Sequence, residues 1–510
     1  MEMAIYPNMI FSPYGEYWRQ MRKICVTELL SAPRVRSFKS IREEEARGLV
    51  DNMRSLSCSP FNLSEKIFAF SNSIISKAAV GRRCKQQEAF IALLKESVAL
   101  TGGFGVAEIF PSLKILTRLS RMKSKLDMLV GKMDKIFDSI IEEHKMEIDR
   151  SSRINEDDAL GGGEDILDVL LRLEQSKEVG FHPTVDDIKG LILELFGAGS
   201  YSSSATVEWT MSELIRNPEV MAKAQAEVRQ ALKGKHHVEE SDLNELKYLK
   251  SIIKETLRLH PPAPLIPREA IEEAEIDGYR VPVNSRIIVN ALTLGRDPDY
   301  WTDSEKYEPE RFLESSVDFK GTDFQFLPFG SGRRSCPGTA FAYANIELLL
   351  ASFLYHFDWK LPNGKAPEEL DMTETFGMVV KRKNDLNVRH CDAAALDAIV
   401  NEDLVEANVI VNAIGEAGAV DELVDHEDAI TKDDVLEEAH VDLAPELILE
   451  DDDVLAMEGA TPGGGAAGLG NEVLGGEQSL EKLQMMELFE KEGRKLEKKV
   501  LLERVLILLV

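Results

Sequence analysis

Residues 329–338 read FGSGRRSCPG and contain the most informative pattern of the sequence. On residue type alone, a single cysteine such as Cys336 is most often a small buried hydrophobic residue. The glycines around it favour another role, because they let the backbone fold tightly and leave N–H groups free to point at the sulfur. Residues 339–355 are almost all apolar and predict a buried helix, whose N-terminal dipole would stabilise a thiolate. A thiolate beside backbone donors and two arginines suits a soft metal ion or a haem iron.

One further pair of residues has a spacing that places both side chains together. Glu255 and Arg258 are three residues apart, so they share one face of a helix predicted over residues 242–260. Taken alone, Glu255 and Arg258 would be interpreted as a surface ion pair, which is far commoner.

A long helix is predicted over residues 185–216. Thr184 and Asp187 fit a capping box, with Asp in place of Glu, and the pattern stops before Asn217-Pro218. A helix of about 32 residues is about 48 Å long. Since it is apolar on most sides, it should lie in the core.

Four motifs, in the right order, resemble those of the cytochrome P450 family. Residues 329–338 resemble its signature, with five residues at the family's spacing. Residues 255–258 resemble its ExxR pair, residues 309–312 its PERF motif, and residues 18–22 (WRQMR) its WxxxR. The resemblance covers residues 8–388, and details at 18–23 and 208–214 resemble the plant microsomal group, which oxidises terpenoids, phenolics and alkaloids. The five signature residues are Phe329, Gly332, Arg334, Cys336 and Gly338.

The resemblance implies a mainly α fold with small β-sheets and a haem b cofactor. Cys336 would be the iron ligand, within the cofactor-binding loop of Phe329, Gly332 and Gly338. Contacts to the haem propionates would come from Trp18, Arg22, Arg268 and Arg334. A structural network would join Glu255, Arg258 and Arg311. Trp18 and Arg22 lie about one helical turn apart, in a helix predicted over residues 14–60, so both could reach one edge of the cofactor.

The implied activity is that of a monooxygenase that hydroxylates a small hydrophobic plant metabolite, with a terpenoid favoured. It would use O₂ and electrons from an NADPH–cytochrome P450 reductase. No GxGxxG follows a predicted strand, which agrees with an external electron donor. The basic residues Arg19, Lys23 and Arg333 are candidates for part of a docking surface for an acidic partner; a solvated charged face is the alternative.

The long helix departs from the family where oxygen would be activated. Residues 198–203 read AGSYSS, whereas the family has Ala/Gly-Gly-x-Asp/Glu-Thr-Thr/Ser. Ala198 and Gly199 are small and would leave room for O₂. Ser202 stands where a threonine hydroxyl assists oxygen protonation, or it hydrogen-bonds back to the carbonyl of Ala198. Tyr201 replaces the family's acid, and a phenol with a pKa near 10 is a poor proton shuttle. We therefore predict weakened coupling between O₂ reduction and substrate oxidation.

Charge divides the chain into two unlike parts. The formal net charge is −29, which argues against non-specific nucleic-acid binding, because phosphate contacts need a basic face. Residues 391–510 contain 30 acidic and 8 basic residues. We predict a cytochrome P450 domain over residues 1–389 that begins without the anchor and the first helices and strands. Residues 390–510 would be an acidic, disordered tail with a possible helix at 480–510, or else a small acidic domain.

The remaining patterns concern cysteines, membranes and competing functions. Five cysteines are too few and too scattered for a disulfide scaffold, and no window reaches the roughly 20 apolar residues of a spanning helix. The resemblance implies the cytosolic face of the endoplasmic reticulum membrane, and the lack of an anchor implies the cytoplasm. Two other functions stay open: a haem protein of this ancestry without monooxygenase activity, such as an isomerase or an inactive paralogue, and an interaction protein that acts through its acidic tail.

Overall fold

The computed structural model describes residues 6–56, 59–81, 92–93, 96, 122–151, 164–176, 181–375 and 377–392. The chain divides into two units, Met1–Asp392 and Ala393–Val510. The acidic tail, its proposed disorder and its predicted helix at 480–510 lie outside the described residues. The last described strand ends at Asp392 rather than at the predicted domain boundary of 389. The strand continues because Phe357–Lys360 pairs with it up to that residue.

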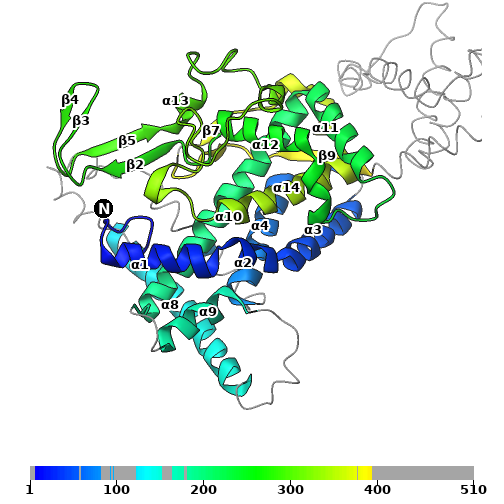
Figure 1. Cartoon of the computed structure of the whole chain (residues 1–510). Helices are drawn as coiled ribbons and strands as arrows, with labels where there is room; N and C mark the ends of the chain where they lie inside the picture. The colour runs from blue at the N-terminus through cyan, green and yellow to red at the C-terminus, as the bar shows by residue number, and fades with distance from the viewer. Residues whose placement is uncertain are drawn as a thin grey trace, which may run out of the picture. The chain divides into compact units, whose positions relative to one another are not determined.

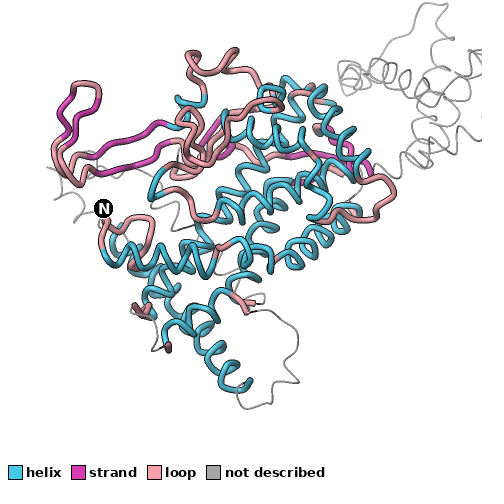
Figure 2. Tube along the Cα trace, viewed as in Figure 1, coloured by secondary structure: helices cyan, strands magenta, loops and turns pink. Residues whose placement is uncertain are grey.

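The described part of the first unit is mainly helical, as predicted, with small antiparallel sheets (Figures 1 and 2). Its α-helices are α1 (Glu16–Ile24), α2 (Ala32–Ser37), α3 (Lys39–Arg54), α4 (Leu63–Val80), α8 (Met122–Ser151), α9 (Ile166–Gln175), α10 (Val185–Arg216), α11 (Pro218–Ala231), α12 (Lys247–Leu259), α13 (Ala291–Gly295) and α14 (Thr339–His356). A π-helical turn spans Cys25–Leu29, and 3₁₀ turns span Glu240–Glu245, Pro309–Phe312, Gly332–Arg334, Pro362–Gly364 and Pro367–Glu369.

The strands form one three-stranded sheet and three two-stranded ones among the described residues. The strands are β1 (Phe61–Asn62), β2 (Leu265–Glu269), β3 (Ala274–Ile276), β4 (Tyr279–Val281), β5 (Arg286–Asn290), β6 (Phe357–Lys360), β7 (Glu374–Thr375), β8 (Lys381–Arg382) and β9 (Asn387–Asp392). β9 lies between β1 and β6, and β2–β5, β3–β4 and β7–β8 are hairpin pairs.

The structure differs from the sequence-based predictions in two segments that contain prolines. Strand β2 was not predicted, because Pro264 and Pro267 made its sequence look irregular. Pro267 is tolerated there because, in a two-stranded sheet, each strand has a free edge on which the missing N–H is not needed. The helix predicted over residues 14–60 is in fact three helices and a π-turn. Pro33 favours a new first turn, at the start of α2.

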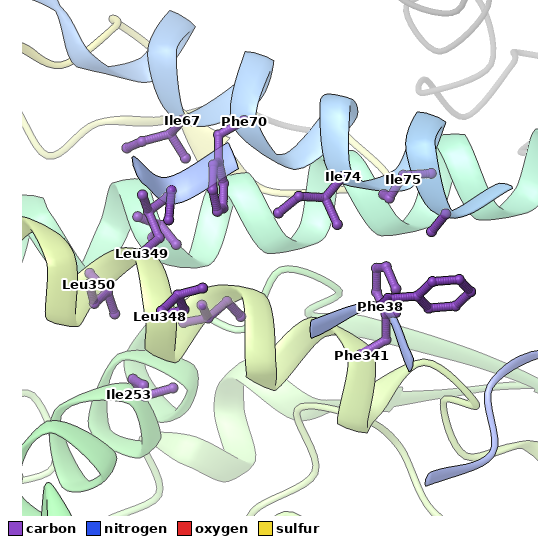
Figure 3. Close-up of a cluster of buried hydrophobic side chains, with 14 of the residues drawn as sticks. Phe38, Ile67, Phe70, Ile74, Ile75, Ile253, Phe341, Leu348, Leu349 and Leu350 are labelled. Atoms are coloured by element: carbon purple, nitrogen blue, oxygen red, sulfur yellow. The ribbon is translucent and has the colours of Figure 1, made fainter. Parts of the chain in front are cut away.

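Helix α10 is the centre of the core. Its N-terminus has the predicted capping box, in which the Asp187 N–H donates to Thr184 Oγ1 at 3.2 Å and the Thr184 N–H donates to the Asp187 carboxylate at 2.8 Å. Its 32 residues are buried along most of their length, and α4, α12 and α14 pack against it. Figure 3 shows apolar side chains of α4, α12 and α14 gathered in one cluster beside it.

Candidate functional site

The loop around Cys336 is a tight backbone turn that only its glycines permit. Gly330 and Gly332 have φ of 69° and 70°, a region that residues with a Cβ rarely adopt. The backbone N–H of Cys336 then donates to the carbonyl of Phe329 at 2.9 Å, which closes the loop. Residues 332–334 form a 3₁₀ turn, and α14 begins at Thr339, three residues after the cysteine. The signature loop therefore lies directly before the N-terminus of the buried helix α14, as the sequence order predicts.

Cys336 is a solvent-exposed residue, yet many protein atoms lie around its thiol. Desolvation is the largest effect on its pKa and raises it, while the Gly338 N–H, the Thr339 hydroxyl and the charge of Arg22 lower it. The side chain therefore reaches solvent on one side while protein atoms surround it on the others. The predicted stabilisation of a thiolate is present as a set of donors, but burial outweighs it in the protein alone. A cation bound at the sulfur would reverse that balance.

Three guanidiniums gather at this loop. Arg22 Nη2 lies 3.5 Å from Ser335 Oγ, and Arg268 Nη2 lies 3.5 Å from the carbonyl of Ser331. The pKa of Arg334 is lowered, chiefly by desolvation and then by the nearby charges of Arg268 and Arg22. Among the described residues, no carboxylate forms an ion pair with any of the three. A half-buried cationic cluster of this kind is a ready site for an anionic group.

Trp18 packs against Arg334 of this cluster, but its indole N–H donates elsewhere. Its indole is buried and its Nε1–H donates to the carbonyl of Met9 at 3.1 Å. The guanidinium of Arg334 lies 4.6 Å from the centre of its ring, a cation–π arrangement. Arg334 also donates to the carbonyl of Ser12 at 2.6 Å. Trp18 therefore orients Arg334, and its own N–H is committed to the backbone rather than to a propionate.

The predicted network of Glu255, Arg258 and Arg311 is brought together in the core. Arg258 donates twice to the Glu255 carboxylate, at 2.8 Å and 2.7 Å, and Arg311 Nε donates to it at 3.0 Å. The side chains of Glu255 and Arg258 are fully buried. Arg258 also donates to the carbonyls of Gly295, Ser304 and Lys306, so this buried charge set is densely hydrogen-bonded. The network binds α12 to the segment 295–311 and leaves no atom for a substrate.

The two small residues in the central stretch of α10 point to different surroundings. Ala198 is exposed, and the Ser202 hydroxyl donates to its carbonyl at 2.6 Å, which is one of the two roles considered for Ser202. Gly199 faces α4, because a Cβ added there would lie 2.7 Å from Ile75 Cδ1. Its small size permits the close packing of α10 against α4.

Tyr201 also packs against α4. Its ring meets that of Phe68 edge to face, with the centroids 5.0 Å apart. Burial raises the pKa of the Tyr201 phenol to about 12. Its position in the helix is the one predicted, and its surroundings make the phenol an even weaker acid than its residue type implies.

A second cluster of titratable side chains has a structural role. His144, Asp165 and Asp168 offer ligand atoms within 4.8 Å of one another, the one such group found among the described residues. His144 Nδ1 lies 3.1 Å from the carbonyl of Ile140, and its Nε2 lies 3.1 Å from Asp165. Both ring nitrogens thus face acceptors, so neither has a lone pair directed at a metal ion.

Comparison with known proteins places this geometry in context. The family model "Cytochrome P450" matches residues 5–388. The chain is 51% identical to premnaspirodiene oxygenase of Hyoscyamus muticus over 380 residues, which is 74% of this chain and 75% of that protein. It is 51% identical to melianol synthase of Ailanthus altissima over 381 residues, 75% of this chain and 73% of that protein. A solved structure of a zebra fish cytochrome P450 with progesterone has a TM-score of 0.62 at 22% identity, covering 75% of this chain and 84% of that one.

Proposed function

The chain belongs to the cytochrome P450 family of haem-dependent monooxygenases, and from this premise we propose that it hydroxylates a small hydrophobic plant terpenoid. One relative is named as the oxygenase of a diene, and the other as the synthase of an alcohol. A diene hydrocarbon offers a hydroxylase only C–H and C=C bonds, and an alcohol is the product that hydroxylation gives. These names favour a hydroxylase over a haem protein without oxygenase activity.

The observation that carries the proposal is the cluster of three guanidiniums beside the Cys336 thiol. Haem b carries two carboxylates, and Arg22, Arg268 and Arg334 form a half-buried set that has no carboxylate partner among the described residues. Cys336 presents its sulfur beside this set, on a loop whose backbone N–H groups and helix N-terminus favour its anionic form. The residues therefore fit a haem with its iron on Cys336 and its propionates on the guanidiniums.

When bound, the haem supplies an iron that activates O₂, and in this family electron donation from the thiolate favours O–O cleavage. The chain's own residues do the rest. Arg334 is held by Trp18 and by the Ser12 carbonyl, so it is fixed before the cofactor arrives. The exposed face of α10 at Ala198 provides space. The Ser202 hydroxyl donates a hydrogen bond to the Ala198 carbonyl, so its oxygen can accept one from a water there. Glu255, Arg258 and Arg311 brace the surrounding fold.

The redox partner is proposed to be an NADPH–cytochrome P450 reductase. Lys23 and Arg333 are exposed, and Arg333 stacks over the Tyr14 ring at 4.9 Å, so its charge faces outward from a fixed position. Arg19 is less suited to docking, because it is paired with Glu16. We also propose location at the endoplasmic reticulum membrane. Within the described ranges, no helix combines the length and apolar character that crossing a bilayer requires.

A carbon monoxide difference spectrum of the reduced, haem-loaded chain tests the proposal. We expect the red-shifted Soret band of a thiolate-bound iron, followed by hydroxylation of candidate terpenoids when reductase and NADPH are added. A band at the shorter wavelength, or none, would mean that Cys336 does not ligate iron in this chain. A thiolate band with no product from any hydrocarbon terpenoid would instead refute the substrate class. A role for the acidic tail as an interaction segment concerns residues that the structure does not describe.

A further inference from the structure

Glu194 is a half-buried acid on α10 that the sequence patterns did not single out. Its Oε1 accepts a hydrogen bond from the backbone N–H of Ile10 at 2.8 Å. Its Oε2 is buried and has no hydrogen-bond partner among the described residues, and no described cation pairs with the carboxyl. An unpaired buried oxygen is costly, and an ordered water is its usual partner.

The other carboxyls of α10 are engaged elsewhere. Asp187 caps the helix, Glu208 accepts from the Ser64 hydroxyl, and Glu213 is bound to His260 at 2.7 Å. Asp186 is exposed in the first turn. Glu194 is thus the one carboxyl of α10 that combines an anchored oxygen with a buried, unpaired one.

Glu194 shares a helix face with the residues that replace the family's oxygen-activating pattern. It is four residues before Ala198 and eight before Ser202, and side chains at i and i+4 lie one above the other. At 1.5 Å per residue the rise is about 6 Å to Ala198 and about 12 Å to Ser202. One or two waters can bridge the first gap, and the hydroxyl of Ser202 already points at the carbonyl of Ala198.

We propose that Glu194 is the proton donor for oxygen reduction in this chain, acting through water toward Ala198 and Ser202 in place of the acid absent at 201. This rests on the proposed function. The overall reaction converts R–H, O₂, two electrons and two protons into R–OH and H₂O. The electrons come from the reductase. Glu194 gives a proton to the water beside Oε2 and is reprotonated from solvent.

The environment of Glu194 keeps this proton available near neutral pH. Burial raises the pKa of Glu194 to about 7, and the backbone N–H groups of Ile10 and Met9 lower it. The titratable groups that interact with it are Tyr17 of α1 and Cys25 of the π-turn, whose own pKa values are raised chiefly by burial. Both stay neutral at pH 7, and no charged side chain among the described residues contributes to the shift in the pKa of Glu194. Tyr201, with its pKa about 12, cannot perform this role.

Replacing Glu194 with Gln separates proton donation from anchoring, because the amide oxygen can still accept from the Ile10 N–H. In the haem-loaded full chain, the infrared spectrum should contain a protonated carboxyl band that disappears as pH rises through about 7 and is absent from Glu194→Gln. Product formation should fall by about 10²-fold, the lower range for a positioned acid, with the electrons diverted to peroxide and KM little changed. The unaltered chain should lose coupling above pH 7, whereas Glu194→Gln should show no such dependence.

The matched control is Asp186→Asn, an exposed acid on the same helix, which should change neither the infrared band nor the peroxide share. If the unaltered chain shows no thiolate band, the proposed function fails and the relay fails with it. If the thiolate band is present but Glu194→Gln leaves the peroxide share and its pH profile unchanged, the relay alone is overturned. Glu194 would then be only an anchor for the segment at Met9 and Ile10.

Discussion

The loop around Cys336 and the central stretch of α10 follow the family's pattern to different degrees. At the loop, every signature residue is present and the backbone turn closes as the pattern requires. At residues 198–203 the acid is replaced by Tyr201, the threonine by Ser202, and Gly199 faces α4. The difference separates two demands on such a protein. Holding a cofactor depends on a backbone fold and several charges together, whereas delivering a proton depends on one group that can stand elsewhere on the same helix face.

The largest effect should come from the loop. Cys336→Ala removes the sulfur of the signature loop, so the thiolate Soret band should vanish. Haem retained through Arg22, Arg268 and Arg334 would show the shorter-wavelength band after carbon monoxide addition. Cys25→Ala is the control, since Cys25 is buried in the π-turn with its pKa raised by burial. A thiolate band that survives in Cys336→Ala would move the site away from this loop.

The next largest effect should come from the network that braces the loop's surroundings. Glu255→Ala leaves the guanidiniums of Arg258 and Arg311 without their carboxylate, and Arg258 is fully buried. Breaking a buried ion pair by removing one partner costs about 3–5 kcal/mol. Urea unfolding monitored by circular dichroism should therefore show a large loss of stability. The exposed pair Arg280–Glu273 offers the contrast, because Glu273→Ala should cost less than about 1 kcal/mol.

How far the sequence predicted these two regions depends on what kind of contact fixes each. The loop, the Glu255–Arg258 pair and the capping box of α10 are set by residues at short, fixed spacings, so their patterns were sufficient. Arg311 is 56 residues from Glu255 and was expected from the family resemblance. The orientation of Gly199 and Tyr201 depends on Ile75 and Phe68 of α4, more than 120 residues away in the chain. The sequence has no local signal for that contact. Glu194 was missed for a similar reason, because its partner Ile10 is 184 residues distant.

The guanidiniums should affect cofactor affinity by a smaller amount. Arg268→Ala and Arg334→Ala each remove one charge-assisted hydrogen bond, worth about 1.5 kcal/mol, or about tenfold in haem affinity. Arg334→Ala should have the larger effect, because it also removes the contact with Trp18. Titration of the full chain with haem measures both, and Arg280→Ala is an exposed control. Equal affinity in all three variants would show that the cluster does not bind the propionates.

The helix side should respond to restoring an acid. Tyr201→Asp places a carboxyl at the family's position and should lower the peroxide share of consumed electrons several-fold, about 1 kcal/mol in the partition. The effect should be greater in the Glu194→Gln background, where no other donor remains. Tyr201→Asn is the matched control, because it loses the same contact with Phe68 without supplying an acid. An unchanged peroxide yield in Tyr201→Asp would show that coupling in this chain is not limited by the residue at 201.

The smallest effect should come from Gly199→Ala, and it tests which way this glycine faces. The new Cβ would lie 2.7 Å from Ile75 Cδ1, the flexible end of a side chain that can move. The gain in helix propensity, up to about 1 kcal/mol, opposes the cost of that shift, so stability should change by less than about 1 kcal/mol. Gly190→Ala is the control at a rigid contact, because its Cβ would lie 2.1 Å from the Pro7 carbonyl oxygen, and it should be clearly more destabilising. Since Gly199 packs on α4, the carbon monoxide spectrum and the peroxide share should stay as they are. A change in either would mean that Gly199 lines the oxygen space after all, and that α10 keeps more of the family's pattern than its contacts with α4 indicate.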